Sequence, residues 1–133
     1  MQSLFSTIHG KLGDWLAQDI QRSHEVLHYL QKYQAVSSRI IQILIFGVLT
    51  GFCEELVMRG SLQPLLIRIT KNTHWGIILT SILFSLLHLS LLNFIPILIL
   101  SLWLGYLRHY SGSVILGVLI HILNNSLALF QSL

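Results

Sequence analysis

Long apolar stretches separated by short polar ones make up the chain from residue 39 onward. A helix that is apolar on every face is typical of a membrane span, which takes roughly 20 residues to cross about 30 Å of hydrocarbon. The pattern therefore predicts an all-α polytopic membrane bundle of about four core transmembrane helices, the third being the shortest. The predicted helices cover residues 39–58, 75–92, 94–107 and 113–130.

The polar segment at 59–74 connects the first two predicted helices. Pro64 within it tolerates only a helix start, a kink or a turn, because proline lacks the backbone N–H and clashes with the preceding turn. Arg68 and Lys71 indicate that the segment reaches a polar surface.

The first 38 residues follow a different pattern. Their apolar positions recur at helical spacing with charged residues between them, which predicts an amphipathic helix too polar to span a membrane. Such a helix fits a membrane surface, and the alternative is a soluble helix packed on the chain's own loops. Residues 1–38 are thus predicted to form an N-terminal surface segment and residues 39–133 the core domain. The apolar positions are Leu12, Trp15, Leu16, Ile20, Val26, Leu27 and Leu30.

Composition strengthens the membrane assignment. Of the 133 residues, 53% are hydrophobic and 10% are charged, whereas an average soluble domain has roughly 25% charged residues. The formal net charge of +3 comes from basic residues scattered along the chain, so no nucleic-acid partner is expected. The single cysteine, Cys53, cannot form an internal disulfide.

The first predicted helix carries three ionisable residues in the stretch GFCEELVMRG. An unpaired charge at the centre of a bilayer costs at least about 2.5 to 3.5 kcal/mol, so such residues mark function by default. At about 100° per residue, Glu55 and Arg59 share a face and can pair, whereas Glu54 points elsewhere. Glu55 then acts as a structural anchor, and the partly desolvated Glu54 becomes a candidate general base or acid. The alternative is that both glutamates lie in water at a helix end without a catalytic role.

Two histidines and two asparagines are the main polar groups of the later helices. His88 follows Phe84 by one turn, and His121 precedes Asn125 by one turn, next to Asn124. Small residues on the same stripes indicate where helices approach closely, so the polar faces are predicted to meet. These small residues are Gly47, Gly51, Ser113 and Gly117.

Three short motifs lie in order along these helices: EELVMR at 54–59, FSLLH at 84–88 and HILNN at 121–125. Together they resemble the EExxxR, FxxxH and HxxxN/D motifs of the CPBP family, the CAAX protease and bacteriocin-processing group, also called Abi. The likeness covers about residues 40–130, with Met58 where the family often has an aromatic residue. It implies an intramembrane endopeptidase in a cell membrane, here the bacterial inner membrane.

The predicted site residues have distinct roles in peptide-bond hydrolysis. Glu54 and His88 can hold one water, with Glu54 accepting its proton as the water attacks the carbonyl. His121 and Asn125 can donate hydrogen bonds to the developing oxyanion. Glu55 and Arg59 would fix the first helix and orient Glu54.

No cofactor is required in this preferred mechanism. A zinc-bound version stays open, with Glu54, His88 and His121 as ligands, because relatives have been described both as metalloproteases and as metal-free glutamate proteases. Against zinc, the chain has no HExxH motif.

The expected partners are membrane lipid and a hydrophobic or lipidated peptide or protein. Two other functions are compatible with the same residues. One is a non-catalytic protein of bacteriocin self-immunity that binds a peptide, and the other is a small channel or proton carrier. Convergence of a glutamate, two histidines and an asparagine favours the enzyme, because sequestration alone does not require it.

Overall fold

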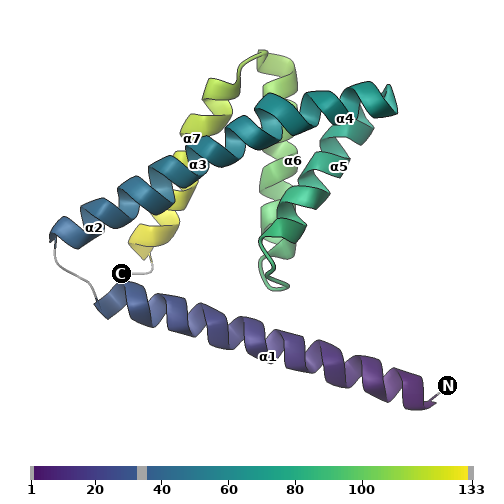
Figure 1. The fold of residues 1–133 in the computed structure, drawn as a ribbon, viewed down its shortest axis with the longest axis vertical. Coiled ribbons are helices and arrows are strands. Elements are labelled where there is room, and N and C mark those ends of the chain that lie inside the picture. Colours follow the sequence, from purple (N-terminus) through teal and green to yellow (C-terminus); the bar gives the residue numbers. More distant parts are fainter. Residues whose placement is uncertain (1, 33–35, 132–133) are drawn as a thin grey trace.

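The computed structural model describes residues 2–32 and 36–131, and all regular structure in this part of the chain is helical. Figure 1 shows a long N-terminal helix beneath a group of packed helices. The N-terminal helix is α1 (Gln2–Lys32), and the later helices are α5 (Thr73–Leu87), α6 (Phe94–Ser111) and α7 (Val114–Gln131). Between them runs one long rod made of α2 (Val36–Gln42), η1 (Ile43–Leu49), α3 (Thr50–Glu55), η2 (Leu56–Leu62) and α4 (Gln63–Thr70).

The long rod does not end at residue 58, as the sequence pattern predicted, but continues through the polar segment. Pro64 lies in the first turn of α4, where its missing N–H is tolerated, directly after the π-helical turns of η2. The wider π-helical turn accommodates the proline without breaking the rod. The rod ends at Lys71, whose φ is 52°, and Asn72 caps the next helix by accepting a hydrogen bond from the Trp75 N–H.

The second helix also differs from its prediction. Helix α5 ends at Leu87, whereas the apolar pattern predicted a helix to residue 92. His88 caps its C-terminal end, and Leu89 adopts a φ of 51° that no α-helix allows. Helix α6 is longer than predicted, and α7 agrees with the predicted span to within two residues.

One helix in the described part of the chain is long and apolar enough to cross a membrane. It covers Ser38–Thr70, 33 residues with a mean hydropathy of 1.9. Thr73–Leu87 and Val114–Phe130 are apolar but shorter. The all-α class is confirmed, and the four-span bundle stays a prediction.

Burial follows a pattern opposite to that of a soluble protein. Many large apolar side chains face outward, whereas much of the interior is polar. Polar groups gather inside when the surroundings are lipid, because lipid offers them no hydrogen bonds. The described buried polar side chains of the helices after α1 are Glu55, Arg59, Gln63, Thr80, Ser81, Ser85, Ser101 and His121.

Glycines let the helices approach closely, as predicted for the small-residue stripes. A Cβ atom at Gly51 would lie 3.2 Å from the backbone nitrogen of Ile122 on α7. One at Gly76 would lie 2.8 Å from the backbone nitrogen of Ile67, where α5 meets α4. Only glycine allows backbones this near each other.

Helix α1 crosses beneath the loop between α5 and α6 (Figure 1). The amphipathic helix predicted for residues 1–38 is present, although residues 1 and 33–35 of that segment, like 132–133 of the predicted core, lie outside the described residues. Its position at a membrane surface stays a prediction.

We expect Gly76→Ala to lower the free energy of unfolding by about 1 to 3 kcal/mol, because the added methyl overpacks the contact between α4 and α5. Gly60→Ala is the matched control, since a Cβ there meets nothing within 4 Å. Thermal denaturation in detergent measures both. Equal melting temperatures for the two variants would contradict the close packing.

Candidate active site

A fully buried polar contact joins Glu55 to Arg59, as their spacing predicted. Their side chains are 0% and 1% exposed, and Arg59 Nη1 lies 2.9 Å from Glu55 Oε1. This is an ion pair whose N–H bonds are not aligned for a hydrogen bond. The guanidinium also lies over the Phe84 ring, 5.1 Å from its centre, so α5 covers the pair.

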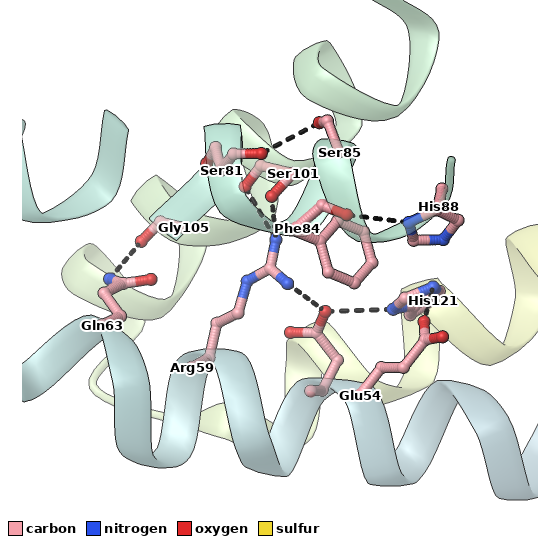
Figure 2. A network of polar contacts seen from close by, with 11 residues as sticks. Glu54, Arg59, Gln63, Ser81, Phe84, Ser85, His88, Ser101, Gly105 and His121 are labelled. Atoms are coloured by element: carbon pink, nitrogen blue, oxygen red, sulfur yellow. Dashed lines mark hydrogen bonds and ion pairs between the residues drawn. The ribbon is translucent and has the colours of Figure 1, made fainter. Parts of the chain in front are cut away.

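Helix α6 accepts hydrogen bonds from the second terminal nitrogen of the Arg59 guanidinium. Its Nη2 donates to the carbonyl of Ser101 at 2.8 Å and to the Ser101 hydroxyl at 2.9 Å. One turn further along both helices, Gln63 Nε2 donates to the Gly105 carbonyl at 3.0 Å (Figure 2). Neither Ser101 nor Gln63 was predicted from the sequence. Gln63 lies one turn after Arg59, and Ser101 lies one turn before Gly105.

His121 lies on α7 between the two glutamates. Its Nδ1 is 3.0 Å from Glu55 Oε1, and its Nε2 is 3.3 Å from Glu54 Oε2. The Nδ1 contact with Glu55 is a hydrogen bond, whereas the longer Nε2 contact with Glu54 does not meet hydrogen-bond geometry. Arg59 and His121 together give the buried Glu55 carboxylate two polar partners, which offsets the cost of burying its charge.

The two glutamates differ in their access to solvent. The side chain of Glu54 is 29% exposed, whereas that of Glu55 is fully buried. Water and substrate can therefore reach Glu54 but not Glu55. The two carboxylates thus have different surroundings, and their division into a reactive and a structural one stays a prediction.

His88 meets the cluster through Phe84. Its Nδ1 lies 2.8 Å from the Phe84 carbonyl, and because a carbonyl only accepts, Nδ1 carries the hydrogen. The Phe84 ring is 4.6 Å from the His88 ring and 5.8 Å from the His121 ring, centre to centre. Figure 2 shows His88, His121 and Glu54 on the same side of Phe84. His88 is exposed, so its Nε2 can accept a hydrogen bond from water.

Asn125 does not join this network. It lies one turn beyond His121 and is half-buried. Its side chain makes no hydrogen bond within the described part of the chain. Asn124 is exposed. Gly117, one turn before His121, lies against the cluster instead, since a Cβ there would be 2.8 Å from Glu55 Oε2.

The side chains do not form a ready metal site. Within residues 2–32 and 36–131, no three His, Cys, Asp or Glu side chains are arranged to hold a metal ion. His121 directs both ring nitrogens at carboxylates, and His88 directs Nδ1 at a carbonyl. The arrangement as it stands does not fit the predicted zinc ligands Glu54, His88 and His121.

Apolar helices that enclose a buried Glu–Arg–His cluster, with one carboxylate left accessible, define a helical membrane protein with a polar site inside it. The family model described as type II CAAX prenyl endopeptidase Rce1-like matches residues 36–127. The chain belongs to this Rce1-like family of membrane-embedded peptidases. The match includes all three motifs on which the sequence resemblance rests. No curated protein and no solved structure matched the chain.

Removing Arg59 alone should unfold the site. We expect Arg59→Met to lower the free energy of unfolding by about 3 to 5 kcal/mol, because it leaves the Glu55 carboxylate buried without its cation. Adding Glu55→Gln should recover part of the loss, since glutamine removes the charge and still accepts from His121. Thermal denaturation of both variants checks this, with Arg68→Met as the control because Arg68 is an exposed arginine of the same rod. A double variant no more stable than Arg59→Met would contradict the charge argument.

Proposed function

We propose that the protein is an intramembrane endopeptidase of the CAAX-protease and bacteriocin-processing type. It hydrolyses a peptide bond of a membrane-associated protein or peptide with a water molecule activated by Glu54 and His88. One observation carries the proposal beyond family membership: the accessible carboxylate of Glu54 contacts the His121 imidazole, and the rings of His121 and His88 both pack edge-on against Phe84.

The water would lie between Glu54 and His88. The free Nε2 of His88 accepts a hydrogen bond from this water and orients the water oxygen toward the scissile carbonyl. Glu54 accepts the other hydrogen as the oxygen attacks. The hydrogen bond from His88 to the Phe84 carbonyl supports this role, because it keeps the hydrogen on Nδ1 and a lone pair on Nε2.

His121 would couple proton uptake to oxyanion stabilisation. In the resting site its Nε2 lies near Glu54 at 3.3 Å, a long contact. Once Glu54 has taken the proton from water, its carboxyl is neutral and holds that N–H less strongly. The N–H is then free to donate to the oxyanion, a contribution of a few kcal/mol for one donor. Asn125, one turn away on α7, would supply a second donor after rotating toward the substrate.

The substrate is a hydrophobic or lipidated protein or peptide in a cell membrane. The outward-facing apolar side chains of the helices fit lipid, and substrate would reach Glu54 from the membrane. The mechanism requires no cofactor, and every step uses side chains of this chain.

The catalytic pair is tested by single substitutions. We expect Glu54→Gln and His88→Ala each to lower kcat at least about 100-fold, the usual effect of removing a general base or the group that orients its water. Purified protein with a panel of quenched-fluorescent membrane peptides gives the rates. Controls are Glu25→Gln and His109→Ala, which change exposed residues away from the site.

Cleavage that persists in both variants would show that another group activates the water. Peptide that is bound but never cleaved by the unmodified protein would favour the self-immunity function instead.

Metal dependence is tested separately. We expect cleavage to survive exhaustive chelation, with bound zinc near zero by elemental analysis. Activity that disappears on chelation and returns with added zinc would replace the metal-free mechanism with the zinc-bound one.

A further inference from the structure

Helix α1 is held to the rest of the protein at the loop of residues 88–93, which joins α5 to α6 (Figure 1). Its apolar side chains contribute little, since Trp15 is 65% exposed and Ile20 45% exposed. A cavity of about 280 Å³ is lined by Trp15 of α1 together with Leu86 of α5 and Phe94 of α6. Apolar contact therefore holds α1 only loosely, and the attachment needs another source.

That source is Asp19, which is only 6% exposed. One oxygen of its carboxylate, Oδ2, accepts from the Ser90 hydroxyl at 3.0 Å and from the Leu92 N–H at 3.1 Å. The Ser90 hydroxyl in turn accepts from the backbone and side-chain nitrogens of Asn93, at 3.2 and 3.0 Å. A single carboxylate on α1 thus organises the loop up to the start of α6.

The charge on Asp19 strengthens these bonds. The hydrogen bond from the Leu92 N–H, opposed by burial and aided by Ser90 and the nearby Arg22, lowers the pKa of the Asp19 carboxyl. The carboxylate is therefore ionised at neutral pH, and hydrogen bonds to an ionised acceptor are roughly twice as strong as neutral ones. The stability it adds is present at neutral pH and is lost as the pH falls through the lowered pKa.

The loop needs such support directly after His88. Leu89 has a φ of 51°, a left-handed conformation that is unfavourable for a leucine. Arg22 Nη1 reaches the Leu89 carbonyl at 3.5 Å, so α1 contacts the strained residue as well as the loop beyond it. The backbone that carries the His88 ring is thereby fixed from outside the long rod and its partner helices.

We propose that Asp19 is a positioning residue of the peptidase site, which holds the loop of residues 88–93 and with it the imidazole of His88. The inference rests on the proposed function, in which His88 orients the attacking water. Asp19 itself lies outside residues 36–127, the part of the chain that the family model matches. Helix α1 is then part of the working enzyme.

The test uses three variants of the full chain in detergent micelles. Asp19→Ala removes the acceptor, Asp19→Asn keeps an oxygen that can accept both hydrogen bonds, and Asp14→Ala removes the same charge from an exposed position of α1. Nuclear magnetic resonance with ¹⁵N-labelled histidine reports the His88 ring, whose signals are assigned by their loss in His88→Ala. Hydrogen exchange of residues 88–93 reports the loop, and cleavage of a quenched-fluorescent membrane peptide gives kcat and KM.

We expect Asp19→Ala to shift the His88 ring signals, to speed loop exchange about tenfold, and to lower kcat between about 10-fold and 100-fold with KM little changed, because small misplacements of a reacting group are costly. Asp19→Asn should largely restore all three, and Asp14→Ala should resemble the unmodified protein. A lowered melting temperature without these changes would mean a structural role only and would overturn the proposal.

The same variants still test the role of Asp19 if the protein is not a peptidase. If the unmodified protein cleaves no peptide, the His88 signals and loop exchange still decide whether Asp19 holds the loop. Unchanged signals and unchanged exchange in Asp19→Ala would overturn the proposal whether or not the protein is a peptidase.

Discussion

The buried ion pair between Glu55 and Arg59 is the constraint on which the rest of the structure depends. Neither charge reaches solvent, so the surrounding helices must satisfy both. Helix α6 offers the Ser101 carbonyl and hydroxyl, α5 offers the Phe84 ring, and α7 offers the His121 imidazole. Each helix that packs on the long rod therefore does so partly by completing one polar cluster. In lipid this specifies the packing more strictly than apolar contact, which distinguishes poorly between a helix and a lipid tail.

Adjacent positions on one helix give the two glutamates their separate roles. Glu55 points into the protein and is fixed by Arg59, while Glu54, about 100° around the helix, reaches the accessible side. His121 contacts both, so the buried carboxylate and the accessible one are linked through a single imidazole. In the proposed mechanism, the geometry of catalysis is therefore tied to the same cluster that stabilises the fold.

The sequence predicted contacts within one helix better than contacts between helices. The spacing of Glu55 and Arg59 determines that they can pair, and helical geometry alone suffices for that. Which side chains meet across helices depends on the axial offset between the packed helices, and the hydrophobic periodicity of one helix does not determine this offset. The links from His121 to both glutamates and from Ser101 to Arg59 were therefore not predicted. Asn125 has no side-chain hydrogen bond to the described cluster, and its role as an oxyanion donor stays a prediction. The end of α5 at Leu87 was likewise not predicted, because leucine favours a helix and no glycine or proline marks the turn at residues 88–92.

The residues of the candidate site are held in place to different degrees. Glu55 and His121 are buried between packed helices, where each side chain contacts two others. His88 lies at a helix end, its ring fixed by one bond to its own helix and followed by a strained Leu89. His88 thus depends on the loop that follows it, and Asp19 accepts two hydrogen bonds from this loop. If His88 orients the attacking water, as proposed, a helix outside the family-matched region sets the precision of chemistry carried out by residues within it.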